Sequence, residues 1–223
     1  MNTSLFPTDL STPSLLRAQE LVRQRAILHD DHAAPRLIAG VDQAFQGDII
    51  ISGIVVMDSG TIDVVEEVHY VGTVKYPYIP TFLSFREGPA IVSAFSKLHH
   101  TPDILMVDGC GINHPRFAGL ATHIGVALDV PTIAVAKNIL CGKGDEPVEV
   151  GDVSPLVFEG RQVGWLIKSC SRCRPIVLAP GHRVSMDGAL DITKHMLRGH
   201  KLPEPCMLAH RYVNRLKRTI KHL

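Results

Sequence analysis

The chain has 223 residues, a formal net charge of +1, and a composition that is 45% hydrophobic with 18 Gly and 15 Pro. This length predicts one domain with a sizeable core over 1–223, and the composition excludes a largely disordered chain. Because the net charge is close to zero, any binding of nucleic acid would depend on local rather than global charge.

The amino-terminal segment lacks a basic stretch followed by an apolar one, and no apolar run approaches the length of a membrane span. We therefore expect a cytoplasmic protein with no membrane partner. The five cysteines are odd in number and irregular in position, which argues against a disulfide framework and favours a reducing compartment. No coiled-coil repeat is evident, so we expect a monomer.

The first predicted helix covers about 13–28, where Pro13 follows a capping Thr12 and apolar residues recur at helical spacing. Three segments rich in Ile and Val come next and are separated by short polar turns. They lie at 36–43, 49–57 and 61–69. This pattern predicts an antiparallel three-strand meander, followed by a proline-rich connection at 75–80.

Helices and strands alternate after this connection. We predict a helix near 86–99, a strand at 103–108, a helix near 116–128, a strand at 131–136, strands near 154–158, 162–168 and 175–179, and helices near 187–198 and 205–221. The change from hairpins to alternation predicts an α/β fold in which helices flank a mixed sheet, with parallel strands beside the meander.

Three acidic residues stand where apolar runs end, at the rim of the predicted core. They are Asp42 after LIAGV, Glu87 after FLSFR and Asp108 after ILMV. Three carboxylates brought together would repel by roughly 4 kcal/mol per pair at about 4 Å and an effective dielectric of about 20, so the cluster would need a cation. Each residue alone is also typical of a turn or a helix start.

Other motifs are weaker. The segment DGCGINH at 108–114 follows a predicted strand, as a dinucleotide-binding loop would, but it lacks a third glycine at the expected place and Pro115 interrupts the helix start. A Rossmann-type nucleotide-binding protein stays open as an alternative. Cys170 and Cys173 form a single CxxC with no matching pair, which favours two ordinary thiols over zinc.

Several unusual strings, in order, resemble the endonuclease V family over nearly the whole chain. They are GVDQAF at 40–45, PYIPTFLSFRE at 77–87, DGCGINHPR at 108–116, IAVAKNIL at 133–140, GHRVSMDGAL at 181–190 and LPEP at 202–205. The resemblance implies a ribonuclease H-like fold and a Mg²⁺-dependent endonuclease of DNA repair, with Mn²⁺ able to substitute. Such an enzyme acts on deaminated purines, chiefly inosine, and nicks the second phosphodiester on the 3′ side, leaving a 3′-hydroxyl and a 5′-phosphate.

The resemblance also implies roles for the acidic residues and two cationic ones. Asp42, Glu87 and Asp108 would hold Mg²⁺, which prefers oxygen ligands. Lys137 follows an apolar strand and would pair with the scissile phosphate or orient the nucleophile. His210 would orient or deprotonate the attacking water. Without the resemblance, Lys137 reads as a lysine beside a loop and His210 as an exposed helical histidine.

The proline-bounded loop at Pro77, Tyr78, Ile79 and Pro80 has little backbone freedom, and the resemblance implies that Tyr78 separates the strands as a wedge. Residues that the resemblance places near the flipped base or the nucleic acid are Gly111, Ile112, His114, Arg116, His123, Leu140 and Gly142. A turn that tucks Tyr78 against the protein is the simpler interpretation of the loop.

The substrate stays open between DNA and RNA, because no residue identifies a contact to a ribose 2′-hydroxyl. An inosine-specific endoribonuclease is therefore a second hypothesis. A nucleic-acid-binding module without catalysis is a third, although it would leave the three acidic residues without a purpose.

Overall fold

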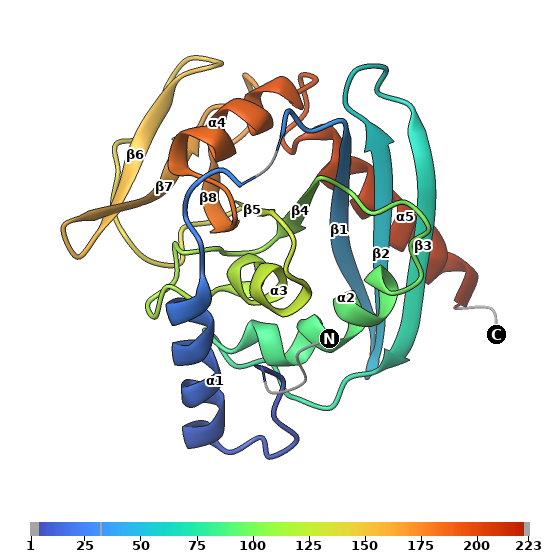
Figure 1. The fold of residues 1–223 in the computed structure, drawn as a ribbon. Helices are drawn as coiled ribbons and strands as arrows, with labels where there is room; N and C mark the ends of the chain where they lie inside the picture. Colours follow the sequence, from blue (N-terminus) through green and yellow to red (C-terminus); the bar gives the residue numbers. More distant parts are fainter. Residues whose placement is uncertain (1–4, 32, 221–223) are drawn as a thin grey trace.

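The computed structural model describes residues 5–31 and 33–220 and contains one eight-stranded sheet with helices on both faces (Figure 1). The elements in chain order are α1 Thr12–Arg25, β1 Leu37–Gln46, β2 Ile49–Asp58, β3 Val64–Thr73, α2 Leu83–Phe95, β4 Ile104–Asp108, α3 Leu120–Leu128, β5 Thr132–Ala136, β6 Val153–Phe158, β7 Arg161–Ile167, β8 Ile176–His182, α4 Met186–His195 and α5 Glu204–Ile220. Residue 221, the predicted end of the last helix, lies outside the described residues.

The strand order in the sheet is β3-β2-β1-β4-β5-β8-β7-β6. The first three strands form the predicted antiparallel meander, and β1, β4 and β5 are parallel neighbours. β8, β7 and β6 then continue the sheet in antiparallel fashion. The predicted mixed sheet is confirmed. The Rossmann alternative is wrong, because antiparallel strands flank the three parallel ones on both sides.

The two faces of the sheet are covered by different helices because side chains alternate along each strand. Ala39, Val41, Leu105 and Val107 face α2 and α3, as part of one buried cluster. Ile38, Ile104, Met106, Ile133 and Val135 belong to a second cluster that includes residues of α4 and α5. Figure 1 shows α2 and α3 in front of the sheet and α5 behind β1, β2 and β3.

Two glycines let α5 lie unusually close to the sheet. A Cβ on Gly40 of β1 would overlap the carbonyl oxygen of Pro205, and one on Gly53 of β2 would lie 2.6 Å from Cγ1 of Val213. Real Cβ atoms do not approach other atoms this closely, so α5 would have to move away if either glycine carried a side chain. The close packing fixes the position of α5 on β1 and β2.

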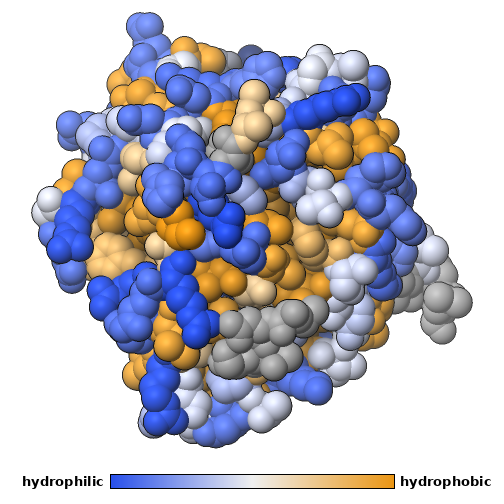
Figure 2. Space-filling view, viewed as in Figure 1, coloured by the Kyte–Doolittle hydropathy of each residue, from blue (hydrophilic) through white to orange (hydrophobic). Residues whose placement is uncertain are grey.

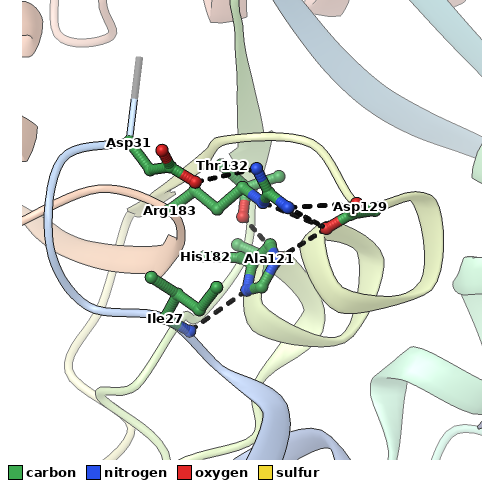
Figure 3. A network of polar contacts seen from close by, with 7 residues as sticks. All are labelled: Ile27, Asp31, Ala121, Asp129, Thr132, His182 and Arg183. Atoms are coloured by element: carbon green, nitrogen blue, oxygen red, sulfur yellow. Dashed lines mark hydrogen bonds and ion pairs between the residues drawn. The ribbon is translucent and has the colours of Figure 1, made fainter.

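The segment that follows α1 is tied to the strand end of β8 by a polar network (Figure 3). The amide of Ile27 donates to Nδ1 of His182 at 3.2 Å, and the amide of Arg183 donates to the carbonyl of Ile27 at 2.7 Å. The Arg183 guanidinium also pairs with Asp31 and Asp129. Burial lowers the pKa of His182, in keeping with a neutral ring that accepts at Nδ1.

Several predicted boundaries differ from the structure by three or four residues, and two of the shifted starts have a local reason. β3 begins at Val64 rather than at 61, since Ile62 adopts a left-handed φ of 66° in the preceding turn. The helix predicted near 116 begins at Leu120, because Phe117 has a φ of 53° and cannot continue a helix. The helix predicted near 86 begins earlier, at Leu83.

Cys170 and Cys173 are joined as a disulfide in the loop between β7 and β8, whereas Cys110, Cys141 and Cys206 are free. The expectation of two ordinary thiols at 170 and 173 is therefore corrected. A three-residue separation brings the two cysteine Cα atoms to 5.4 Å, within the usual range for a bridge. None of the helices in the described part of the chain is long and apolar enough to cross a membrane.

Candidate active site

Three charged residues reach the same edge and the same face of the sheet. Each stands four residues after an isoleucine of the cluster that faces α4 and α5, since Asp42, Asp108 and Lys137 follow Ile38, Ile104 and Ile133. Because strand side chains repeat with period two, all three charged residues point to that face. β1 and β4 run parallel with Val41 beside Val107, so Asp42 and Asp108 follow at the same level.

Asp42 is buried and is held by groups from two parts of the chain. One oxygen, Oδ1, accepts from the amide of Gln43 at 2.7 Å. The other, Oδ2, lies 2.7 Å from Nδ1 of His210 on α5. Asn214, one turn further along α5, places its Nδ2 3.2 Å from Nε2 of His210 and donates to the carbonyl of His210. The ring of His210 is thus oriented from both of its nitrogens.

Asp108 ends β4 and pairs with the lysine that follows β5. Nζ of Lys137 lies 2.5 Å from Oδ2 of Asp108. Burial and the charge of Asp42 raise the pKa of Asp108, although Lys137 acts against them. Burial disfavours the charged form of Lys137, but Asp108 outweighs burial and the pKa of Lys137 is raised. Lys137 therefore remains a cation beside the two aspartates.

Glu87 approaches this edge from α2, on the opposite face of the sheet. Its position is one turn inside the helix rather than at the helix start, so the interpretation as an amino-terminal helix acid is wrong. Its exposed fraction is 8%. Burial, together with the charges of Asp42 and Asp108, raises the pKa of Glu87 to about 8. The positive charge around Glu87 is too small to stabilise its ionised form beside two other carboxylates, so Glu87 holds its proton more strongly.

The three carboxylates have the chemistry of a site for a hard divalent cation, because oxygen donors gather where their mutual repulsion is uncompensated. As they stand, no three His, Cys, Asp or Glu side chains of the described residues are close enough together to hold a metal ion. Asp42 is turned to His210 and Asp108 to Lys137. A bound cation would require small side-chain rotations that release these carboxylates.

A cavity of about 310 Å³ opens beside Asp108 and Lys137. Its walls come from the loop before α2, the loop after β4 and the loop after β5. The lining residues are Tyr78, Pro80, Thr81, Leu83, Ser84, Asp108, Gly109, Cys110, His114, Gly119, Leu120, Ala136, Lys137, Asn138, Ile139 and Leu140. The cavity is mostly apolar, with charged groups at one end, as suits a flat heterocycle attached to a phosphate.

The predicted wedge loop lies at the mouth of this cavity. Tyr78 is 68% exposed, and Ile79 and Leu140 are also exposed. The simpler interpretation, with Tyr78 tucked against the protein, is therefore wrong. Hydrophobic residues show between hydrophilic ones across the middle of the face drawn in Figure 2, while hydrophilic residues dominate its rim.

The predicted base-contacting glycines do not line this cavity. A Cβ on Gly111 would overlap the carbonyl oxygen of Pro180, and one on Gly142 would lie 2.9 Å from the carbonyl oxygen of Val157. Ile112 is buried in the core. Gly111 and Gly142 therefore serve close packing of their loops, and Gly142 also has a φ of 89° that favours glycine.

The two predicted histidines and the arginine lie behind the wedge loop rather than on the surface. His123 is fully buried between the rings of Phe6 and Phe85, with Nε2 2.9 Å from the carbonyl of Leu5. The expected nucleic-acid contact of His123 is corrected, because no ligand can reach it. His114 lines the cavity, and Arg116 binds the loop from inside.

Sequence reasoning missed the residues that set the position of His210. Gly40, Gly53 and Asn214 carry no chemistry that distinguishes them from other residues of their kinds. The spacing could have indicated the contact between Asn214 and His210, because residues four apart in a helix lie on the same face. The glycines in β1 and β2 could have been noticed as interruptions of apolar strands, which indicate close approach of another backbone.

The mixed sheet with helices on both faces is the ribonuclease H-like fold, which the chain shares with solved structures of nucleases. The family model described as Endonuclease V matches residues 20–211. The chain belongs to the endonuclease V family, whose members are nucleases.

Individual relatives agree with this assignment. An endonuclease V of Xanthomonas campestris is 44% identical over 96% of this chain and 94% of its own. The crystal structure of endonuclease V from Bacillus subtilis is 29% identical, with a TM-score of 0.92 and 98% of each chain covered. Endonuclease V of Ciona intestinalis is 21% identical with a TM-score of 0.84, covers 96% of this chain and 100% of its own, and was solved with DNA containing an inosine followed by a ribo-adenosine.

Proposed function

We propose that this protein is a Mg²⁺-dependent endonuclease of DNA repair that recognises deaminated purines, chiefly inosine, in DNA. It nicks the second phosphodiester on the 3′ side of the lesion and leaves a 3′-hydroxyl and a 5′-phosphate. The observation that carries the proposal is the gathering of Asp42, Glu87 and Asp108 with Lys137 and His210 beside a cavity of about 310 Å³.

Asp42, Glu87 and Asp108 would hold the cation, and Mn²⁺ would substitute for Mg²⁺ because both accept carboxylate oxygens. When bound, the cation polarises the scissile phosphate and lowers the pKa of the attacking water. The raised pKa of Glu87 supports this assignment, since a cation would supply the positive charge that the buried carboxyls lack.

Lys137 and His210 act beside the carboxylates. Lys137 remains charged and lines the cavity beside Asp108, from where its ammonium would contact an oxygen of the scissile phosphate. The side chain of His210 is 47% exposed, so a water molecule that displaces the Asn214 amide from Nε2 would be oriented by the ring and could give it a proton while Asp42 holds Nδ1. Asn214 keeps the ring in one orientation.

Tyr78 acts as the wedge and the cavity takes the displaced base. Inserting a ring between stacked bases costs a few kcal/mol per step, and least where pairing is weak, as at an inosine mismatch. Tyr78, Ile79 and Leu140 provide exposed apolar surface at the mouth of the cavity, and Gly109 and Gly119 line its wall without side chains.

A strand-cleavage assay tests the proposal. DNA oligonucleotides with and without one inosine are incubated with Mg²⁺ and mapped to the nucleotide. We expect cuts at the second bond on the 3′ side of inosine, absent for Asp42→Asn and retained for Asp48→Asn, an exposed turn aspartate. Folded protein that cuts neither oligonucleotide would contradict the proposal.

RNA is the second candidate substrate, because the DNA bound to the Ciona protein carries a ribo-adenosine after the inosine. The same assay with matched RNA and with DNA that contains a single ribonucleotide compares the two. A preference for RNA would make this protein an inosine-specific endoribonuclease with the same catalytic residues.

A further inference from the structure

We propose that Gln19 of the amino-terminal helix α1 is a positioning residue for strand separation. Gln19, His114 and Arg116 all donate to the carbonyl of Thr81. These hydrogen bonds fix the loop that carries Tyr78. This inference rests on the proposed function, because it concerns how the wedge is kept in place.

Three donors converge on the carbonyl oxygen of Thr81. Nε2 of Gln19 lies 2.7 Å from it, Nε2 of His114 lies 3.0 Å from it, and Nη2 of Arg116 also lies 3.0 Å from it. Nη2 of Arg116 donates in addition to the Thr81 hydroxyl at 2.6 Å. A carbonyl oxygen usually accepts one or two hydrogen bonds, so three donors to the Thr81 carbonyl are more than usual.

The donors also hold one another, which makes the group a network rather than three separate bonds. Nε of Arg116 donates to Oε1 of Gln19 at 2.6 Å, and the guanidinium lies 4.8 Å from the ring centroid of Phe82. Nδ1 of His114 accepts from the amide of Arg116, so Nε2 carries the proton that is donated to Thr81. Burial keeps that ring neutral and lowers the pKa of His114 to about 4.

Gln19 is fully buried, although it is a polar residue and does not line the cavity. A buried amide is retained where both its donor and its acceptor find partners, and here the donor faces Thr81 and the acceptor faces Arg116. α1 therefore has a specific polar contact with the loop before α2, besides its apolar packing around Leu15, Ala18 and Phe85.

The held carbonyl belongs to a residue in an unusual conformation. Thr81 has a φ of 70°, which non-glycine residues adopt only where their surroundings enforce it. At the other end of the loop, Nη1 of Arg86 donates to the carbonyl of Tyr76 at 2.8 Å. The exposed Tyr78 thus lies between two backbone carbonyls, of Tyr76 and Thr81, that are each held by hydrogen bonds.

This arrangement has a consequence for substrate choice. A wedge has to be rigid only when a base pair must be opened, because single-stranded DNA presents its inosine without strand separation. Loss of the Gln19 contact should therefore slow cleavage of duplex DNA much more than cleavage of single-stranded DNA. A residue that merely supported the fold would affect both substrates alike.

The experiment uses Gln19→Leu, which removes both polar contacts at similar volume, and Gln19→Glu, which keeps an acceptor for Arg116 and removes the donor to Thr81. The matched control is Arg183→Leu, because Arg183 ties the segment after α1 to the rest of the protein without contacting the loop (Figure 3). Kinetics on single-stranded and duplex inosine oligonucleotides are measured with amide hydrogen exchange of peptides spanning 76–82.

For both Gln19 variants we expect duplex cleavage to fall roughly tenfold or more, since displacements of about 1 Å at a distance can cost up to about a hundredfold. Single-stranded cleavage should change less than about twofold, and exchange across 76–82 should quicken. Arg183→Leu should leave the ratio of duplex to single-stranded rates unchanged. An equal loss on both substrates in the Gln19 variants would overturn the inference.

Failure of the proposed function gives a different result. Wild-type protein that leaves both inosine oligonucleotides uncut would overturn the proposed function, whereas the exchange rates still test the contact itself. In that case, faster exchange across 76–82 in the Gln19 variants supports the positioning role, and unchanged exchange overturns it. If Gln19→Leu does not fold, Gln19→Glu provides both measurements.

Discussion

Nδ1 of His210 lies 2.7 Å from Oδ2 of Asp42, although 168 residues separate the two along the chain. The contact requires that α5 crosses the back of β1 at a fixed height, which Gly40 and Gly53 allow. The candidate active site is therefore assembled from both faces of the sheet, with Glu87 arriving from α2 and His210 from α5.

Replacement of His210 by alanine should lower the rate of cleavage by roughly a hundredfold or more, the usual effect of losing a general base. The fold should be unaffected, because nearly half of the side chain is exposed. Single-turnover cleavage of an inosine oligonucleotide measures the loss. His200→Ala is the control, since His200 is similarly exposed and lies before α5; a comparable loss there would contradict a specific role for His210.

Gly40→Ala should destabilise the protein by about 3 kcal/mol, because the new methyl group overlaps the carbonyl of Pro205 and pushes α5 off the sheet. Cleavage should fall as well, since His210 moves with the helix. Urea unfolding measures the first effect and single-turnover kinetics the second. Gly60→Ala, in a turn where the nearest atom is the far end of Asp58, should change stability by less than about 0.5 kcal/mol.

The stability of the metal-free protein should fall as the pH rises from about 6.5 to about 8. The pKa of Glu87 is about 8 in the folded protein and near 4.5 in an unfolded chain, so between these values only the folded state keeps the proton. Raising the pH removes that advantage. The buried histidines with lowered pKa values have the opposite effect, but only below about 6.5.

Two conditions should remove this dependence. Glu87→Gln has no proton to lose, and saturating Mg²⁺ stabilises the ionised carboxyl. Urea unfolding of wild type and Glu87→Gln across this pH range, each with and without Mg²⁺, measures all four cases. Stability that rises with pH in the metal-free wild type would show that Glu87 ionises normally.

Tyr78→Ala should leave the thermal unfolding temperature unchanged, because the side chain is 68% exposed. Cleavage of duplex DNA should fall roughly tenfold while single-stranded DNA is cut at nearly the wild-type rate, since stacking of one aromatic ring on a base contributes about 1–3 kcal/mol. Val148→Ala is the control, because Val148 is 79% exposed and does not line the cavity. Equal rates for Tyr78→Ala and wild type on duplex DNA would exclude a wedge.

Titration of the denatured, oxidised protein should find three free thiols, and five after reduction, because Cys170 and Cys173 are paired. The loop that this disulfide closes is very short, so reduction should cost no more than about 2 kcal/mol of stability. A thiol reagent and a thermal melt measure the two quantities. Five thiols in the oxidised protein would mean that the pair stays reduced in solution.

Hydrophobic periodicity in the sequence predicted most elements to within a few residues, because alternation and helical spacing report which side chains are buried. The pairing of β1 with β4, which places Asp42 level with Asp108, was not predicted, because periodicity does not report which strands are neighbours. Where boundaries failed, as at Ile62 and Phe117, the cause was a left-handed residue that has no signature in composition.

The order of residues in the chain does not show which helix covers which face of the sheet. The role of His210 was therefore inferred from the family resemblance alone, and its contact with Asp42 was not predicted. The same limit applies to His123 and Arg116. The resemblance implied a nucleic-acid contact for both, yet His123 is buried in the core and Arg116 is directed at Thr81. Burial of a polar residue depends on its distant partners, which spacing does not reveal.

Because His210 lies on α5, the last element of the chain, all strands of the sheet are synthesised before the active site can be completed. A growing chain that had emerged only as far as β8 would already contain Asp42 on β1, Glu87 on α2 and Asp108 on β4, and would still lack the histidine proposed to orient water. In the proposed mechanism, docking of α5 onto β1 completes the active site, so a nascent chain would reach its full cleavage rate only after that helix has left the ribosome and docked.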